Sequence, residues 1–146
     1  FMVGSPGQTA KMLAKDLKWI ETFQPDMCGI GPFIPHHATC YAEKPAGSVE
    51  LTCYLLSIIR LIKPNVLLPA TTALATLDDA GTEKGILSGA NVVMPNLSPT
   101  EAKRRYELYN HKAGEGTESA RNLDELKLRM KAIGYRVITD RGDIRK

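Results

Sequence analysis

The sequence lacks the features that mark membrane, secreted and nucleic-acid-binding proteins. No apolar run approaches the roughly 18 residues that would suggest a bilayer-spanning helix. No basic segment followed by an apolar stretch opens the chain, so we expect no secretory signal and a cytoplasmic location. The net charge is only +3, and residues 100–146 mix 12 basic with 8 acidic residues. We therefore expect neither a nucleic-acid nor a membrane partner.

Cysteine is also scarce. The three cysteines are Cys28, Cys40 and Cys53, and no Cys-x-x-Cys pair occurs. An odd number at wide spacing excludes a disulfide framework and provides no recognisable zinc or redox motif. We expect three reduced thiols. The alternative is that Cys28 or Cys40 lies near a ligand pocket, because both flank a segment rich in glycine and proline.

Short apolar runs and longer helical patterns alternate along the chain, within a composition typical of soluble globular proteins. Strands are predicted at residues 1–4, 27–30, 66–68 and 91–94, the third cut by Pro69, and residues 31–47 form a long loop. Helices are predicted after the capping residues Thr9 and Ser48 and over residues 78–87. The expected inward-facing residues are Leu13, Leu17 and Ile20 in the first helix and Leu51, Leu55, Ile58 and Ile62 in the second.

The C-terminal third has its own helix signals. Ser-Pro-Thr-Glu at residues 98–101 is a capping box that predicts a helix through Tyr106 and Tyr109. Residues 110–120 have the composition of a linker. A second capping box at Asn122 and Glu125 predicts a helix that ends at Gly134, followed by a short strand at residues 135–138. The expected apolar stripe of that helix is Leu123, Leu126, Met130 and Ile133.

Four strand–helix units in succession predict an α/β fold with parallel strands and crossover helices. Two architectures fit this pattern: an open doubly wound sheet, or part of a closed barrel. Four units would make half of a (β/α)₈ barrel, which typically needs about 250 residues.

Ligands of parallel α/β folds bind at the carboxyl ends of the strands. Here those ends are rich in glycine, proline, threonine and histidine, which suits close backbone approach and hydrogen bonding to a ligand. Ordinary strand-to-helix turns use the same residues and remain an alternative. His36 and His37 are adjacent on an extended chain, so we expect their side chains to point to opposite faces and not to share a metal ion.

Five segments together resemble the radical S-adenosylmethionine maturases of [FeFe]-hydrogenase, the HydE type, which are similar to biotin synthase. They are Gly-Ser-Pro-Gly-Gln-Thr at 4–9, Gly-Ile-Gly-Pro-Phe-Ile-Pro-His at 29–36, Pro-Ala-Thr-Thr-Ala-Leu at 69–74, Gly-Ala-Asn-Val-Val-Met-Pro-Asn at 89–96 and Tyr-Glu-Leu-Tyr at 106–109. The resemblance implies that residues 1–112 are the C-terminal half of a TIM-type (β/α)₈ radical-SAM barrel. Residues 113–146 would then be a linker, a helix and a short strand or tail.

The resemblance also implies cofactors and site residues. The family holds a [4Fe–4S] cluster through Cys-x₃-Cys-x₂-Cys and reductively cleaves S-adenosylmethionine to a 5′-deoxyadenosyl radical, which serves the assembly of the hydrogenase active-site cluster. That motif is absent from these 146 residues. We therefore expect no metal ligand and no catalytic residue in the chain, and no activity from it alone. The implied cofactor-binding residues are Gly4, Ile30, Gly31, Phe33, Ile34, Met94, Tyr106 and Tyr109, and Thr71 and Thr72 would contact substrate or an anion.

The resemblance leaves the substrate open. The first alternative is a sibling enzyme, biotin-synthase-like or of the mutase type, and the second is a non-catalytic half-barrel that only binds. The partners implied are a small molecule or small iron–sulfur precursor, an N-terminal half-barrel and other hydrogenase maturases. A half-barrel alone exposes strand edges and an apolar interior, so we expect the isolated chain to self-associate.

Overall fold

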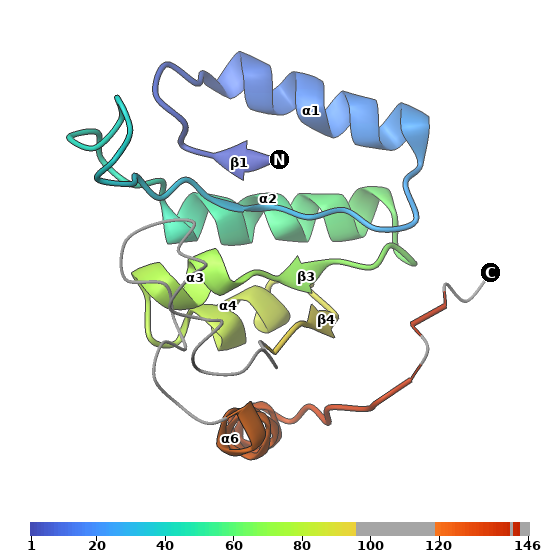
Figure 1. The fold of residues 1–146 in the computed structure, drawn as a ribbon. Helices are drawn as coiled ribbons and strands as arrows, with labels where there is room; N and C mark the ends of the chain where they lie inside the picture. The colour runs from blue at the N-terminus through green and yellow to red at the C-terminus, as the bar shows by residue number, and fades with distance from the viewer. Residues whose placement is uncertain (96–118, 141, 144–146) are drawn as a thin grey trace.

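The computed structural model describes residues 1–95, 119–140, 142 and 143 (Figure 1). The strands are short: β1 (Met2–Val3), β2 (Gly31–Pro32), β3 (Pro69–Ala70) and β4 (Val92–Val93). The helices are α1 (Ala10–Phe23), α2 (Val49–Ile62), α3 (Thr72–Leu77), α4 (Gly81–Leu87) and α6 (Ser119–Ala132). This arrangement confirms the predicted α/β class. Over the described ranges, no helix is long and apolar enough to cross a membrane.

The strand segments run parallel and lie side by side in the order of the sequence. β1 pairs with β2, and β3 pairs with β4. Between the two pairs, a single parallel bridge joins Met27 to Leu67, so the segment before β2 lies beside the segment before β3. The paired residues are Met2 with Gly31, Val3 with Pro32, Pro69 with Val92 and Ala70 with Val93.

Two predicted strands are shifted toward the C-terminus. The strand expected at 27–30 is β2 at Gly31–Pro32, because this segment pairs with Leu67 near its start and with β1 only at its end. The strand expected to stop before Pro69 instead contains Pro69. A proline is tolerated there because the Leu68 carbonyl accepts from the backbone N–H groups of Asn91 and Val92, and these bonds do not require an N–H at residue 69.

Helices α1 and α2 begin where their capping residues predict. The Thr9 hydroxyl accepts a hydrogen bond from the backbone N–H of Met12 at 3.4 Å, and the Ser48 hydroxyl accepts one from Leu51 at 3.0 Å. In α1, Leu13 and Ile20 are buried and Leu17 is partly buried, as predicted.

The predicted inner face of α2 is wrong in part. The buried residues are Val49, Thr52, Leu55, Leu56 and Ile59, whereas the expected Leu51 is exposed. The helix is apolar around most of its circumference, so several stripes with helical spacing overlap in its sequence. The choice among them is made by contact with the strands on one side and α4 on another.

The helix expected over residues 78–87 is confirmed as α4, which begins three residues later than predicted, whereas α3 was not predicted. α3 follows Thr71 directly, and α4 begins at Gly81. Thr71 precedes α3 without giving it a side-chain cap, so the usual sequence signal for a helix start is missing. The Asp78 carboxylate accepts a hydrogen bond from the backbone N–H of Ala80 at 2.9 Å and organises the turn between the two helices.

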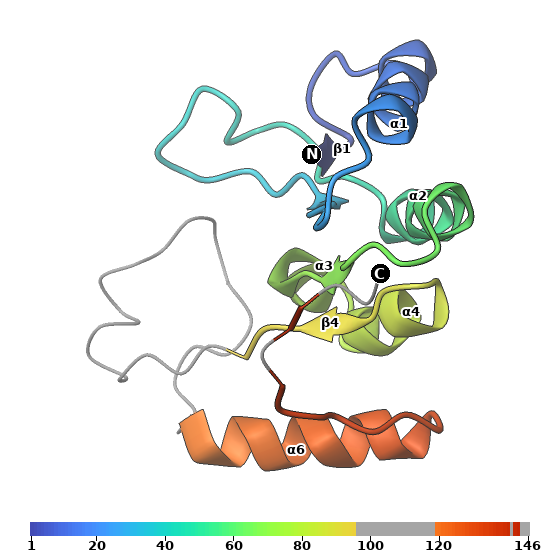
Figure 2. The same cartoon turned by 90° about the vertical axis from the view of Figure 1, so that its right-hand side faces the viewer.

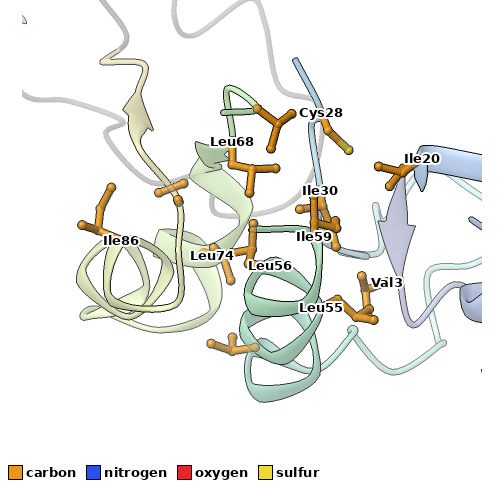
Figure 3. Close-up of a cluster of buried hydrophobic side chains, with 14 of the residues drawn as sticks. Val3, Ile20, Cys28, Ile30, Leu55, Leu56, Ile59, Leu68, Leu74 and Ile86 are labelled. Carbon is orange, nitrogen blue, oxygen red and sulfur yellow. The ribbon is translucent and has the colours of Figure 1, made fainter. Parts of the chain in front are cut away.

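The two faces of the strand layer differ. Val3, Cys28, Ile30, Leu68 and Ala70 point toward the helices and are buried in the core. Figure 3 shows this core, where strand residues meet Leu56 and Ile59 of α2, Leu74 of α3 and Ile86 of α4. Because side chains alternate along a strand, the residues between these point to the other face. Met2 and Met27 on that face are exposed. In Figure 2, α1, α2 and α4 all lie on one side of the strands.

α6 packs against α4 beyond the fourth strand. It begins at Ser119, so the capping box predicted at Asn122 is wrong: Asn122 lies within the helix. The predicted stripe is confirmed for Met130, which is buried, and for Leu126 and Ile133, which pack against the core. Residues 135–138 form no strand. Val137 rests against the core, but the segment finds no strand partner in the described part of the chain. The helix predicted from Ser98 through Tyr109 and the linker before Ser119 lie outside the described residues.

Arg129 of α6 joins this helix to α4. Its guanidinium donates to both carboxylate oxygens of Glu83, at 2.5 and 2.6 Å, and to the backbone carbonyl of Asp79 at 2.7 Å. The hydrogen bond from Arg129 lowers the pKa of the Glu83 carboxyl from its ordinary value of 4.5. The same bond raises the pKa of Arg129. Two hydrogen bonds from one guanidinium to one carboxylate fix the relative orientation of the two groups as well as the distance between them.

We expect Arg129→Gln to loosen α6 and to lower the free energy of unfolding by about 1–2 kcal/mol at neutral pH, since both partners are only partly exposed. Glu83 has a lowered pKa in the folded state, so its contribution is complete above 4.5 and is lost as the pH falls through the lowered pKa. Urea unfolding at several pH values checks this. Lys127→Gln is the matched control, because Lys127 pairs on the exposed surface with Asp124. Equal, pH-independent losses in both variants would contradict the assignment.

Candidate functional site

The ends of β1 and β2 are held together by a backbone contact between two glycines. Phe33 donates its N–H to the Val3 carbonyl, and Gly47 donates its N–H to the Phe33 carbonyl, both at 2.8 Å. Gly4 has a φ of +81°, and a Cβ on it would lie 2.6 Å from the Cα of Gly47. Close packing therefore explains the glycine at position 4 without a ligand. The Gln8 side chain also bonds to the end of β1. Its amide oxygen accepts from the Gly4 N–H at 2.7 Å, and its amide nitrogen donates to the Met2 carbonyl at 2.9 Å.

The structure brings Gly31 and Thr71 together at neighbouring strand ends. A Cβ on Gly31 would lie 2.6 Å from the Thr71 hydroxyl oxygen. That oxygen is buried, and it has no hydrogen-bond partner among the residues that the structure describes. Buried hydroxyls usually find a partner, so an unpaired one at a strand end is a candidate ligand contact. Thr72, the first residue of α3, follows it directly.

The other predicted residues take different positions. Met94 follows β4 as Thr71 follows β3. Because Ala70 pairs with Val93, Met94 and Thr71 lie next to each other in register. Met94 is exposed. Ile30 points the other way, into the core between the strands and α2. Phe33 is buried, with its ring edge-on to Tyr41 of the following loop at 6.1 Å, and Ile34 is partly buried. Tyr106 and Tyr109 lie outside the described residues.

The two histidines near these ends are arranged differently from the prediction, whereas the cysteines are free thiols, as expected. The His36 and His37 rings do not point to opposite faces; they stack with centroids 4.3 Å apart, because the chain turns at this point. In the described ranges, no three His, Cys, Asp or Glu side chains are grouped to hold a metal ion. Cys28 is buried in the core, where burial raises the pKa of its thiol, and Cys40 is exposed on the loop.

Comparison with known proteins gives the family. The chain is 43% identical over 108 residues to the [FeFe] hydrogenase maturase subunit HydE of Thermotoga maritima, and the alignment covers 74% of this chain. The matched segment is of the HydE type. This confirms the family resemblance. The alignment covers 31% of the relative, so the HydE-type segment corresponds to about a third of that protein. No protein-family model matches the chain.

The strand ends of this HydE-type segment offer binding groups. Gly31, Thr71 and Met94 contribute backbone, a hydroxyl and a thioether, and none of the three ionises in the physiological range. Such an arrangement is suited to holding and orienting a neutral or anionic group.

The sequence prediction missed Gly47. This residue lies far from Gly4 along the chain, in a loop that contains several other glycines and prolines. A Cβ on it would lie 2.0 Å from the Val3 carbonyl oxygen and 2.8 Å from the Phe33 nitrogen. No local signal distinguishes it from an ordinary loop glycine, because the contact that requires glycine is with β1 and β2.

Proposed function

We propose that this chain is the C-terminal half of a radical S-adenosylmethionine enzyme that acts in assembly of the [FeFe]-hydrogenase active-site cluster. The observation that carries the proposal is the 43% identity to a [FeFe] hydrogenase maturase subunit over 74% of the chain. The proposed substrate is a small molecule or small iron–sulfur precursor. The proposed partners are the N-terminal half-barrel and the other hydrogenase maturases.

The order of the strands supports a half-barrel over a doubly wound sheet. A doubly wound sheet reverses its strand order at a switch point, and its helices cover both faces. Here the strand segments follow one another in chain order. The helices α1, α2 and α4 lie on one side of them (Figure 2). The opposite face, with exposed Met2 and Met27, would be the interior of the closed barrel.

The described residues are suited to binding S-adenosylmethionine and are not suited to binding the iron–sulfur cluster. The unpaired Thr71 hydroxyl beside Gly31 would donate to an anionic group, such as a carboxylate of the cofactor or substrate. The backbone at the ends of β1 and β2 would lie against the adenosine side. On one-electron reduction, S-adenosylmethionine supplies the 5′-deoxyadenosyl radical. The described residues offer no ligand set for an iron–sulfur cluster, so the cluster ligands would belong to the other half of the barrel.

The test begins with the reading frame upstream of Phe1, where we expect Cys-x₃-Cys-x₂-Cys after a first strand. The full-length protein, reconstituted with iron and sulfide without oxygen and then reduced, should release 5′-deoxyadenosine from S-adenosylmethionine. The matched control is the same protein with the three cysteines changed to alanine. A cluster-loaded full-length protein that never cleaves the cofactor would refute the proposal. Cleavage without any support of hydrogenase maturation would instead favour a sibling enzyme with another substrate.

A further inference from the structure

The loop between β2 and α2 contains a tight turn that is built on His36. The backbone carbonyl of His36 accepts two hydrogen bonds from Thr39, one from its N–H at 3.0 Å and one from its hydroxyl at 2.9 Å. The His36 ring accepts a third, because Ala38 donates its backbone N–H to Nδ1 at 3.1 Å. In Figure 1 this loop, drawn in cyan, lies at the end of the molecule toward which the β1 arrow points. The turn is therefore at the carboxyl ends of the strands, where the candidate site lies.

The hydrogen bond at Nδ1 ties this turn to the protonation state of His36. An imidazole nitrogen accepts a hydrogen bond only while it carries no proton, so the proton of the neutral ring belongs on Nε2. A second proton would put an N–H on Nδ1, and two donors would then face each other. Histidine is the side chain that gains such a proton near neutral pH. The turn is therefore complete while His36 is neutral, and it loses the Ala38 bond as the pH falls.

His37 is the titratable group that lies against His36. The two rings stack with centroids 4.3 Å apart and planes 27° apart. Two positive charges at this distance repel each other, so the rings take up protons as a coupled pair. The position of any pH response at Ala38 therefore depends on both histidines.

The other elements around the loop bring no fixed charge to His36. The loop contacts the end of β1, whose residues 2–5 are uncharged, and α3, which lies beside Gly31, has no charged residue. At the start of α2, Glu50 accepts from the Ser48 hydroxyl at 3.0 Å. None of the ion pairs within the described ranges includes His36. The remaining titratable side chains of the loop itself are Cys40, Tyr41, Glu43 and Lys44.

Tyr41 connects the turn to the strand ends. Its backbone N–H donates to the Thr39 hydroxyl at 3.3 Å, and its ring lies edge-on to buried Phe33 at 6.1 Å. Phe33 is bonded through its backbone to the end of β1 and to Gly47. Phe33 is also one of the residues implied to bind the cofactor. A looser turn at His36 would therefore weaken the contact that holds the loop against this part of the site.

We propose that His36 is a positioning residue: its neutral ring holds the loop of residues 33–47 against the strand ends, and a proton on Nδ1 releases the turn. In this role His36 acts through Ala38, Thr39 and Tyr41. The proposal deepens the proposed function and rests on it for the identity of the ligand. We expect the full-length protein to bind S-adenosylmethionine more weakly in mild acid than at neutral pH.

Nuclear magnetic resonance tests the turn without any ligand. At about pH 7.5, the ¹⁵N shifts of the His36 ring in the full-length protein should show a proton on Nε2 and none on Nδ1. His37-Ala38 is the one His-Ala pair of the chain. Carbonyl ¹³C-histidine combined with ¹⁵N-alanine therefore selects the Ala38 amide, whose assignment is checked with Ala38→Gly. This amide should titrate together with the His36 ring.

Binding of S-adenosylmethionine to the cluster-loaded, unreduced protein tests the consequence. Between about pH 7.5 and about pH 5.5, the parent should lose about 2–10-fold more affinity than His36→Asn, the usual effect of one neutral hydrogen bond. The asparagine oxygen replaces Nδ1 as acceptor and does not titrate, so this variant also corrects for every other titrating group, including those of the cofactor. His36→Leu has no acceptor and should bind as weakly at the higher pH as the protonated parent does. His37→Asn is the matched control. It should keep the response and move its midpoint to higher pH, because a neighbouring positive charge is absent.

The remaining outcomes separate the turn from the ligand. A proton on Nδ1 at about pH 7.5, or equal pH responses in the parent and His36→Asn, overturns the positioning role and leaves the proposed function intact. A response that disappears in His37→Asn and persists in His36→Asn assigns the titration to His37 and also overturns the role. A protein whose His36 ring and Ala38 amide titrate as expected, but which binds no S-adenosylmethionine at any pH, supports the proton-dependent turn and refutes the proposed function.

Discussion

Gly47→Ala is expected to remove about 3–5 kcal/mol of the free energy of unfolding, a large part of the stability of a domain of this size. The added Cβ would lie 2.0 Å from the Val3 carbonyl oxygen and 2.8 Å from the Phe33 nitrogen. Both are backbone atoms, and they are joined to each other by the hydrogen bond between β1 and the end of β2. The clash is relieved only if the strand end opens.

Urea unfolding followed by circular dichroism measures this loss. Gly29→Ala is the matched control, because a Cβ on Gly29 meets nothing within 4 Å and its φ lies outside the left-handed region. We expect that variant to stay within about 1 kcal/mol of the parent chain. If the two variants unfold at the same urea concentration, the backbone contact between Gly47 and β1 is not present in solution.

Thr71→Val is expected to act in opposite directions on stability and on function. In the isolated chain it removes a buried hydroxyl that has no hydrogen-bond partner in the described part of the chain, while the extended backbone at position 71 suits valine. The variant should be more stable by up to about 1 kcal/mol, which corresponds to roughly 2–4 °C in the unfolding midpoint. No capping bond is lost, because the Thr71 side chain does not cap α3.

In the full-length protein, under the proposed function, the same substitution removes a hydrogen bond to a bound anionic group. We expect about 10–100-fold weaker binding of S-adenosylmethionine or substrate, the usual cost of losing one bond to a charged partner. Calorimetric titration of the cluster-loaded protein, left unreduced so that it does not cleave the cofactor, measures it.

Thr76→Val is the matched control for both halves of this prediction. The Thr76 hydroxyl already donates to the Thr72 carbonyl at 2.9 Å. Its removal should lower stability slightly and leave ligand affinity unchanged. A destabilised Thr71→Val protein would show that the hydroxyl has a partner within the fold. A Thr71→Val protein that binds its ligands as tightly as the parent would show that the hydroxyl contacts no ligand.

The local features of the fold could be predicted from the sequence because their causes are local. Thr9 and Ser48 begin α1 and α2, since each hydroxyl bonds to a backbone N–H three residues ahead. The succession of strand and helix patterns predicted parallel pairing, which the register of β1 with β2 and of β3 with β4 confirms. The family was also readable from its motifs.

Contacts between distant segments could not be predicted in this way. The sequence of α2 contains overlapping apolar stripes, and only its position between the strands and α4 selects the one with Thr52, Leu56 and Ile59. Gly31 and Thr71 were both predicted to bind ligands. Their closeness to each other, and the lack of a partner for the Thr71 hydroxyl among the described residues, depend on how the two strand ends meet. Ile30 was assigned to the same site, yet the alternation of side chains along its strand turns it into the core.

The sequence by itself therefore determined the class of fold, the starts of α1 and α2 and the family, because these depend on residues close together in the chain or on motifs in a fixed order. The tertiary structure decided which faces are buried, why Gly4 and Gly47 must be glycines and where α6 docks. Those features depend on packing and on the direction of individual side chains, and both are set by atoms that belong to segments far apart in the sequence.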